Sequence, residues 1–294
     1  MSDVGGIVIG VNYAELFSPN GTSAYSISAG ILSALYSGAT ASGSTFASTG
    51  NPLLDLKLAQ ADQTTDVAQE ALQPQVSQAI TAFTTAVKNA TSLQTALGNP
   101  NVQKVLLTAN GLSSYIGQTA LVQKVLMSDP TDPTSLVNQL GDSTFLSTVQ
   151  SYDFAKNGLA ELQNPQIVST LTNAYAEVQW RQSLDQATPG LSNALAFLSQ
   201  ASSIKSINDV FANVTNFEVV TTALGIPQGI IDQPLAAQQQ AVNSRLDYSQ
   251  FQNPNFVTSL TDQYLLTMQE NNQSSGTSSQ SLISLAVQSA GILA

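Results

Sequence analysis

The sequence predicts an all-α protein in which duplicated multi-helix units follow a long N-terminal helix, with a short apolar segment at each end. Three observations support this fold class. The dipeptide Asn-Pro recurs, and apolar residues at helical spacing follow it each time. No strand candidates joined by hairpin turns occur after residue 50, and one stretch of sequence is repeated. Asn is a favoured helix N-cap, and Pro at the first helical position lacks only an N–H that would be unpaired anyway.

The first 50 residues are rich in Gly, Ser, Thr and Ala, and we expect them to form a flexible N-terminal arm. Ile7, Ile9 and Val11 alternate with other residues as in one short strand. The stretch 26–36 (SISAGILSALY) has the composition of a short apolar helix. Residues 38–50 then have the composition of a flexible linker.

From residue 51 the helical pattern is sustained. Pro74 is expected to break the first helix, because a proline in a helix removes a hydrogen-bond donor and clashes with the preceding turn. The predicted segments are a long helix over 51–94, a helical unit over 95–178, a connector over 179–199, a second helical unit over 200–270, a polar linker over 271–280 and an apolar helix over 281–294.

The repeated stretch links the two predicted units. Residues 163–175 read QNPQIVSTLTNAY and residues 252–264 read QNPNFVTSLTDQY. A second pair, VNQLGDSTF from residue 137 and VNSRLDYSQF from residue 242, precedes them. Repeats of this kind usually serve packing, and a binding groove between the two units is the alternative. The shared positions predict helix caps and core: Asn164, Pro165, Val168, Leu171, Tyr175, Asn253, Pro254, Val257, Leu260 and Tyr264.

Composition excludes several classes of function. The chain has no Cys and no His, so cysteine nucleophiles, thiolate zinc sites, imidazole metal sites and Ser-His-Asp triads are excluded. Only 9% of the residues are charged, against roughly a quarter in ordinary domains. With 8 Lys plus Arg against 19 Asp plus Glu, the chain lacks the cations to neutralise a nucleic-acid backbone. We therefore predict no nucleic-acid partner.

Three local motifs contain residue types that could serve chemistry. Ser202 and Lys205 match S-x-x-K, a spacing that chance explains in so Ser-rich a chain. Asp129 and Asp132 each precede a proline, where turn and cap roles are expected ahead of a weak cation site. The single Trp, Trp180, is expected to close a helical core, with an interface anchor as the alternative. The sequence thus predicts no catalytic residue, no cofactor and no metal, and hence no enzyme.

No stretch approaches the roughly 18 to 20 apolar residues of a membrane span, so no span is predicted. The apolar run over 5–11 is short and lacks the positive flank of a signal peptide. Export by a leaderless route to the cell surface is therefore expected, with residence in the cytoplasm as the alternative.

Two long strings carry a resemblance to a known family. Residues 105–154 (VLLTANGLSSYIGQTALVQKVLMSDPTDPTSLVNQLGDSTFLSTVQSYDF) and residues 219–265 resemble a bacterial helical family, domain of unknown function 1217. The resemblance extends over about 55–270. It implies a helical fold and a link to flagella, because members are often encoded among flagellar genes. It brings no catalytic residues, and this chain has Gln, Ser and Thr where members carry Arg and Lys.

Together these features favour a structural protein. We expect an exported, self-assembling subunit or accessory of a bacterial cell-surface appendage, related to the flagellum or another filament, whose partners are copies of itself or flagellar and envelope proteins. The alternative is a soluble helical adaptor that binds an appendage component through the groove between its units. The predicted assembly interface comprises Ile7, Ile9, Val11, Ile31, Leu32, Leu35, Leu282, Ile283, Leu285, Val287, Ile292 and Leu293.

Overall fold

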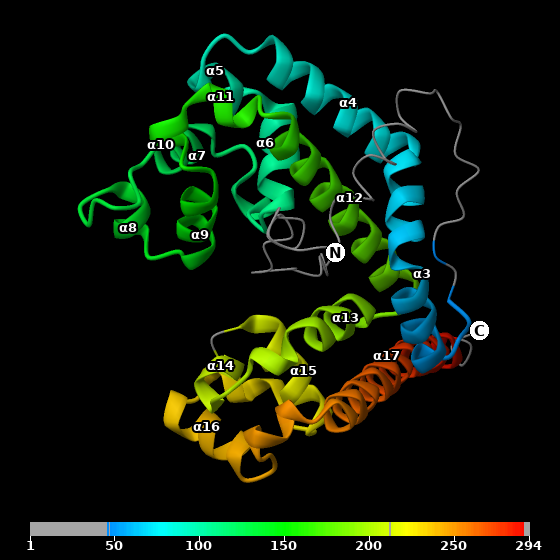
Figure 1. The fold of residues 1–294 in the computed structure, drawn as a ribbon. Coiled ribbons are helices and arrows are strands. Elements are labelled where there is room, and N and C mark those ends of the chain that lie inside the picture. The colour runs from blue at the N-terminus through cyan, green and yellow to red at the C-terminus, as the bar shows by residue number, and fades with distance from the viewer. Residues whose placement is uncertain (1–45, 47, 212, 291–294) are drawn as a thin grey trace. The chain divides into compact units, whose positions relative to one another are not determined.

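The computed structural model of the chain describes residues 46, 48–211 and 213–290, without the side chains of 228 and 273–290 (Figure 1). Within these residues every regular element is a helix, which confirms the predicted all-α class. The strand expected near Ile7 and the apolar segment 26–36 lie outside the described residues.

The chain divides into two compact units. Unit 1 contains Asp62–Ser183, and unit 2 contains Ala47–Ala61 together with Leu184–Ala294. Two helices contribute residues to both units: α3 (Pro52–Leu72) and α12 (Pro165–Ala187). The division therefore does not follow the predicted order of a long helix and then two units, because the start of α3 belongs with the C-terminal part of the chain.

Unit 1 is a set of short helices packed beside the longer α12. Besides parts of α3 and α12, it comprises α4 (Pro74–Asn89), α5 (Leu93–Gly98), α6 (Pro100–Ala109), η1 (Ser113–Tyr115), α7 (Thr119–Leu126), α8 (Leu136–Leu140), α9 (Ser143–Tyr152), α10 (Phe154–Asn157) and α11 (Leu159–Leu162). α4 and α5 both pack against α6, and α7 packs against α5 and α9. Phe83, Leu106 and Phe145 are fully buried among them.

Unit 2 repeats this plan with fewer helices. It comprises α13 (Leu191–Gln200), η2 (Ala201–Ser203), α14 (Ile207–Phe211), α15 (Val214–Ala223), η3 (Gln228–Asp232), α16 (Leu235–Asn243), η4 (Tyr248–Gln252) and α17 (Pro254–Ala290). α17 packs against α15 and α13. The ring of Phe251 lies edge-on to Phe197 at 6.0 Å and to Phe256 at 5.9 Å, which joins η4 to α13 and α17.

The four Asn-Pro pairs begin helices, as predicted. The Oδ1 atom of the Asn accepts a hydrogen bond from the backbone N–H two residues later at Asn51 (3.0 Å), Asn99 (2.9 Å), Asn164 (3.0 Å) and Asn253 (3.0 Å). Each cap satisfies one of the N–H groups that a helix start leaves unpaired. The Pro residues that follow are the first residues of α3, α6, α12 and α17.

The duplication is visible in how the helices end as well. After α6, Leu112 N–H donates to Leu107 O at 2.7 Å, and after α15, Ile226 N–H donates to Thr221 O at 2.8 Å. Both turns pass through a glycine at positive φ, Gly111 at 72° and Gly225 at 62°, which forms the Schellman ending. The residue after each glycine, Leu112 or Ile226, is buried.

The second repeated stretch shows the same correspondence. Val137 and Val242 are both buried, and Asp142 and Asp247 cap the elements that follow, α9 and η4. A phenylalanine within each capped element is buried too, Phe145 at 0% and Phe251 at 1% exposed. Sequence similarity between the units therefore reflects shared caps and shared core positions.

Two predicted boundaries differ from the observed helices. The connector 179–199 is mostly helical, because α12 continues to Ala187 and α13 begins at Leu191. α17 is one helix through 271–280, where the sequence suggests a polar linker before a separate helix. A helix that is already formed extends without a new nucleation cost, so polar residues of moderate propensity can continue it.

Candidate functional site

The two aspartates weighed as a cation site close turns instead. Asp129 Oδ1 accepts from Thr131 N at 2.8 Å and from Thr131 Oγ1 at 2.7 Å. Asp132 Oδ1 accepts from Thr134 N and Oγ1, both at 2.8 Å. The hydrogen bonds from Thr131 hold the pKa of Asp129 below its usual value. Asp132 thus closes the turn that follows it, and the next helix, α8, begins only at Leu136.

The S-x-x-K motif is not arranged for nucleophilic chemistry. Ser203 Oγ donates to the carbonyl of Gln200 at 2.7 Å, and Ser202 and Lys205 are exposed. The backbone N–H of Lys205 donates to Asp209 Oδ2 at 2.9 Å. These residues therefore serve the ends of η2 and α14.

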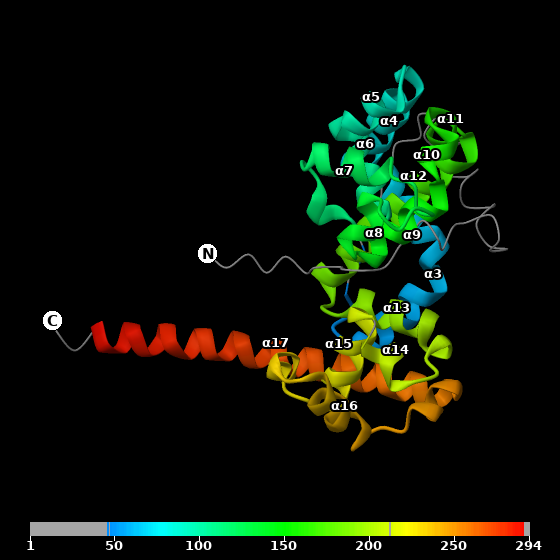
Figure 2. The ribbon, with the colours of Figure 1, turned by 90° about the vertical axis from the view of Figure 1, so that its left-hand side faces the viewer.

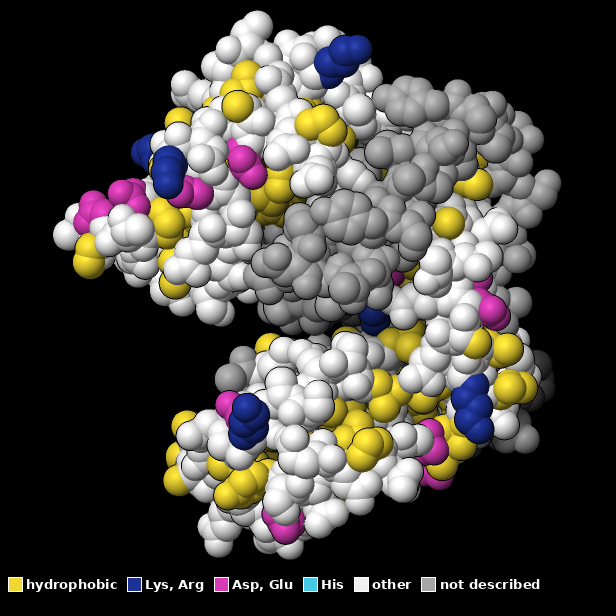
Figure 3. Space-filling model, in the orientation of Figure 1, with side chains coloured by type: hydrophobic (Ala, Val, Ile, Leu, Met, Phe, Trp, Pro, Cys, Tyr) yellow, Lys and Arg dark blue, Asp and Glu magenta, His cyan; other side chains and the backbone are white. Residues whose placement is uncertain are grey.

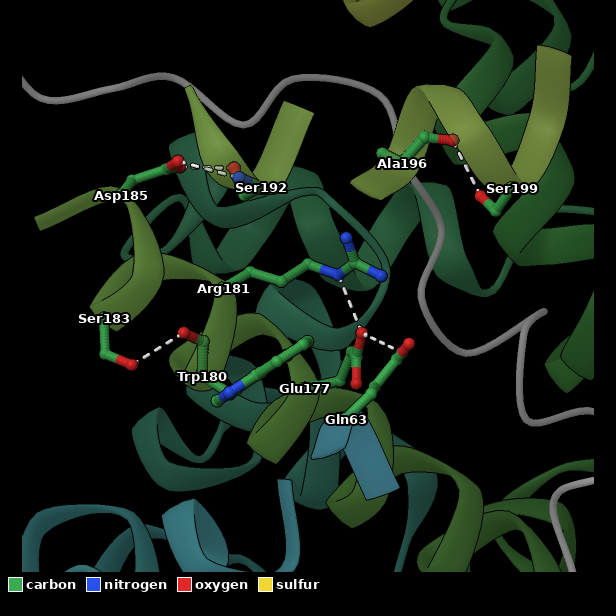
Figure 4. A network of polar contacts seen from close by, with 9 residues as sticks. All are labelled: Gln63, Glu177, Trp180, Arg181, Ser183, Asp185, Ser192, Ala196 and Ser199. Atoms are coloured by element: carbon green, nitrogen blue, oxygen red, sulfur yellow. Dashed lines mark hydrogen bonds and ion pairs between the residues drawn. The ribbon is translucent and has the colours of Figure 1, made fainter. Parts of the chain in front are cut away.

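Unit 1 has a buried polar network on α12 that sequence reasoning missed (Figure 4). Arg181 Nε donates to Glu177 Oε1 at 2.7 Å, and Gln63 Nε2 donates to the same oxygen at 3.0 Å. Glu177 is 0% exposed and Arg181 is 3% exposed. Burial raises the pKa of Glu177, against the opposing effects of Arg181 and Gln63. The available signal was the i, i+4 spacing with Glu first, which is the favourable order on a helix.

Trp180 is buried beside this network, 1% exposed, with the Arg181 guanidinium 5.8 Å from its ring centre. It is therefore a core residue of unit 1. Burial raises the pKa of Asp66 on α3, and the charge of Asp62 adds to the effect. Burial also raises the pKa of Glu70, one turn further along α3.

The predicted repeat positions fall into two groups. Asn164 and Asn253 are caps, and the prolines that follow them are exposed first residues of helices. The remaining positions face the cores of their own units. Leu171, Tyr175, Val257, Leu260 and Tyr264 are buried, and Val168 is half-buried.

Unit 2 has its own buried polar group, the Asp55 cluster, formed by Ser48, Thr49, Asp55 and Thr188. Asp55 Oδ2 accepts from Ser48 Oγ at 2.6 Å and Thr188 Oγ1 at 2.5 Å, and Oδ1 accepts from Thr49 N at 2.8 Å and Oγ1 at 2.7 Å. Burial alone would raise the pKa of Asp55, but these hydrogen bonds outweigh it and hold the pKa low. The cluster fastens residues 48–49 to the turn after α12.

A cavity lies next to the Asp55 cluster. Its volume is about 280 Å³, and it is lined by apolar side chains that include Pro52, Pro189 and Leu265 and by polar ones that include Ser48 and Asn272. Gln269 Nε2, also at the cavity, donates to the carbonyl of Gly50 at 3.2 Å. The first described residues of the chain and the middle of α17 are therefore joined at one place in unit 2.

The predicted assembly residues lie at or beyond the limits of the described chain. Leu282, Ile283, Leu285 and Val287 fall within α17, and their side chains are among those left out. The others, Ile7, Ile9, Val11, Ile31, Leu32, Leu35, Ile292 and Leu293, lie outside the described residues. The part of α17 that carries the first four extends past the other helices of unit 2 (Figure 2).

The described surface carries little charge. Figure 3 shows a few Lys and Arg side chains standing apart from one another, and neutral polar groups dominate the visible face. Among the described residues, no three Asp or Glu come together as a metal site would require. None of the described helices has the length and apolar character needed to cross a membrane.

Comparison with known proteins gives a family and a fold. Residues 109–257 match the family described as protein of unknown function (DUF1217). A crystal structure of a protein from Agrobacterium tumefaciens, determined in a structural genomics programme, matches 76% of this chain and 95% of its own with a TM-score of 0.60. At 21% sequence identity, that likeness shows the fold alone. None of the curated proteins compared with the chain matches it.

Proposed function

Since this chain belongs to the DUF1217 family, whose function is unknown, we propose that it is a non-enzymatic structural or assembly protein. In this proposal it is an exported subunit or accessory of a bacterial surface appendage related to the flagellum. It associates with copies of itself through its two terminal segments, 1–50 and 281–294. Burial of apolar surface between copies would supply the free energy of assembly.

The observation that carries the proposal is the junction in unit 2. The hydrogen bond from Gln269 to Gly50 and the Asp55 cluster hold the start of the body against α17. Gly50, which follows the N-terminal arm, and Gln269, which precedes the end of α17, therefore lie in contact although they are 219 positions apart in the chain. In the proposal, the arm before residue 50 and the end of α17 act on the same neighbouring copy.

The length of the helix α17 also supports the proposal. Beyond Asn272 it continues to Ala290, a rise of about 27 Å at 1.5 Å per residue. Figure 2 shows this part extending past the other helices of unit 2. Its sequence ends in SLISLAVQSA, which is apolar enough to bury against another chain. Only 9% of the residues are charged, so few charges would have to be desolvated at an interface between copies.

Deletion of 281–294 tests the proposal. The full-length chain and the truncated chain are compared by negative-stain electron microscopy and sedimentation velocity over a range of concentration and pH. We expect filaments or regular oligomers from the full-length chain and a folded monomer from the truncated chain. Ser284→Ala is the matched control, because it keeps the length and apolar residues of α17 and should assemble normally.

The same experiment can contradict the proposal in two ways. If the full-length chain remains monomeric under all conditions, self-assembly is wrong and the adaptor alternative becomes the better hypothesis. If the truncated chain assembles as well as the full-length chain, the terminal segments are not the interface.

A further inference from the structure

Two carboxylates and a buried hydroxyl lie near one another in unit 2. Asp185 is in the last turn of α12, Glu218 is on α15 and Tyr264 is on α17. The helices α13, α15 and α17 pack against one another in pairs. Asp185 is tied to the start of α13, because its Oδ1 accepts from Ser192 N at 2.9 Å and its Oδ2 accepts from Ser192 Oγ (Figure 4).

The hydroxyl of Tyr264 is the unusual member of this group. The residue is 0% exposed, and its hydroxyl has no hydrogen-bond partner among the described residues. A Cβ added to Gly190, in the turn before α13, would lie 2.7 Å from the hydroxyl oxygen. Burial raises the pKa of Tyr264, and the charges of Glu218 and Asp185 add to the effect. The hydroxyl therefore points to the place where the two carboxylates act, and it lacks a partner there.

The two carboxylates are also unfavourable neighbours. Glu218 is half-buried, and burial raises its pKa, with the charge of Asp185 adding to the effect. Close carboxylates repel each other when both are ionised, and a buried polar group without a partner destabilises the folded state. A hard cation would relieve both costs, because carboxylate, amide and hydroxyl oxygens are ligands that such ions take. The side chain of Asn193 on α13, a polar neighbour of Glu218 and Tyr264, offers an amide oxygen.

The matching place in unit 1 lacks the acidic group. Asn99 and Asn213 cap α6 and α15, and the residues five positions after these caps are Lys104 and Glu218. A lysine at this position would repel a cation. Unit 1 therefore serves as an internal control for cation binding to unit 2.

We propose that unit 2 binds one Ca²⁺ ion at Asp185 and Glu218, with the oxygens of Tyr264 and Asn193 beside it and water completing the coordination. Ca²⁺ accepts six to eight oxygens in irregular arrangements, whereas Mg²⁺ requires near-ideal octahedral geometry. Two carboxylates are fewer than a tight site would have, so we expect a dissociation constant on the order of 10⁻⁴ to 10⁻³ M. The bound ion would join the end of α12 to α15 and α17. This inference does not rest on the proposed function.

Hydrogen exchange of the full-length chain at low micromolar concentration tests the site. Peptides from α13, α15 and the first turns of α17 are followed in about 10 mM CaCl₂, in MgCl₂ at the same concentration and in NaCl of equal ionic strength. A ligand that binds only the folded unit lowers the open population by the factor 1 + [L]/Kd. With a Kd of about 1 mM, exchange should slow about tenfold in calcium and much less in the other two salts. Peptides from α6 and α9 in unit 1 should not respond.

Three variants locate the response. Glu218→Gln removes one carboxylate at nearly constant size and relieves the repulsion with Asp185, so it should fold and lose most of the calcium response. Tyr264→Phe keeps the ring and should respond less than the unmodified chain. Asp262→Asn is the matched control, because it removes another half-buried carboxylate of unit 2. Its position, two residues before Tyr264 on α17, does not share the face of the tyrosine, so its response should be unchanged.

Several results would overturn the inference. Equal slowing in calcium and sodium, or an equal calcium response in Glu218→Gln and the unmodified chain, would show that no ion binds at the two carboxylates. Equal slowing of peptides from both units would mean that calcium acts on the surface as a whole. Equal slowing in calcium and magnesium would contradict the assignment to calcium.

Discussion

The helices α12 and α17 begin alike and then differ. Both start at the proline of a Gln-Asn-Pro sequence and bury matching residues over about three turns: Leu171 with Leu260, Thr172 with Thr261, and Tyr175 with Tyr264. Beyond the tyrosine the matching positions differ in both chemistry and burial. Glu177, 0% exposed in α12, corresponds to Leu266, 39% exposed in α17. Arg181, 3% exposed, corresponds to the exposed Glu270.

The difference between the later turns of α12 and α17 shows which parts of a duplicated unit are constrained by packing. The first three turns of each helix complete the core of its own unit, and they keep the repeated sequence. The later turns have no shared packing role, so their residues are free to diverge. In α12 these turns carry a buried polar network within unit 1. In α17 they lead into the part of the helix that continues to Ala290.

Breaking the network of unit 1 should have the largest effect. Glu177→Ala removes the carboxylate oxygen that accepts from both Arg181 and Gln63, in a place that water does not reach. Loss of one partner of a buried ion pair costs about 3–5 kcal/mol in the free energy of unfolding. The control is Leu266→Ala at the matching position of unit 2, which should cost less than about 1 kcal/mol because the side chain is partly exposed.

Urea denaturation followed by two signals measures both variants. Fluorescence of the single Trp, Trp180, reports on unit 1 alone, and far-UV circular dichroism reports on both units. Similar losses in the free energy of unfolding from the two substitutions would mean that the two matched positions have similar environments.

A glycine contact in unit 2 should give the next largest effect. Gly190 has a φ of 85°, and an added Cβ would lie 2.7 Å from the Tyr264 hydroxyl oxygen. Gly190→Ala therefore combines left-handed strain of about 1–2 kcal/mol with a steric overlap of about 1–3 kcal/mol. Gly225→Ala is the matched control, because Gly225 has a φ of 62° and nothing lies within 4 Å of its added Cβ.

Hydrogen exchange of peptides from α13 and α17 measures the two glycine variants, since both residues belong to unit 2. Gly190→Ala should open these helices more than Gly225→Ala does. Adding Tyr264→Phe should recover part of the loss, because the nearest clashing atom is the hydroxyl oxygen. Equal exchange in the two alanine variants would show that only backbone strain is at work.

Local features of this fold were predictable from sequence, and long-range ones were not. The helix starts at Asn-Pro and the helix ends at glycine depend on residues within a few positions of each other. The local sequence is therefore enough to predict them. The bond between Gln63 and Glu177 joins residues 114 positions apart, and the bond between Thr188 and Asp55 joins residues 133 apart. Only tertiary packing brings such partners together. The placement of the start of α3 with the C-terminal unit was missed for the same reason, because it depends on packing between distant parts of the chain.

Arg181 and Asp185 have the i, i+4 spacing that is typical of an exposed pair, but Arg181 is buried and donates to Glu177, which lies four residues earlier. Periodicity gave α12 no clear inner face in this region, because polar residues fill positions that are buried. In the sequence, a buried pair of charged residues has the same pattern as charged residues on an exposed helix face.

The smallest predicted effect compares two carboxylates on the single helix α3. Asp55 lies in unit 2, where hydrogen bonds hold its pKa low, and Glu70 lies in unit 1, where burial raises its pKa. Asp55 therefore contributes stability above its unfolded pKa of about 4, and that contribution is lost as the pH falls. Glu70 does the opposite: its contribution is present below its unfolded pKa and is lost as the pH rises through the raised folded value.

Asp55→Asn and Glu70→Gln should thus shift stability in opposite directions at pH 7. The first should destabilise and the second should stabilise, and each difference from the unmodified chain should shrink as the pH falls through the folded-state pKa of the native carboxyl, which is lower for Asp55 than for Glu70. Hydrogen exchange of peptides from the two halves of α3, at several pH values and low protein concentration, separates the two. Shifts of the same sign at pH 7 would mean that the two ends of α3 share one electrostatic environment. That result would contradict the division of this helix between two units with different buried polar groups.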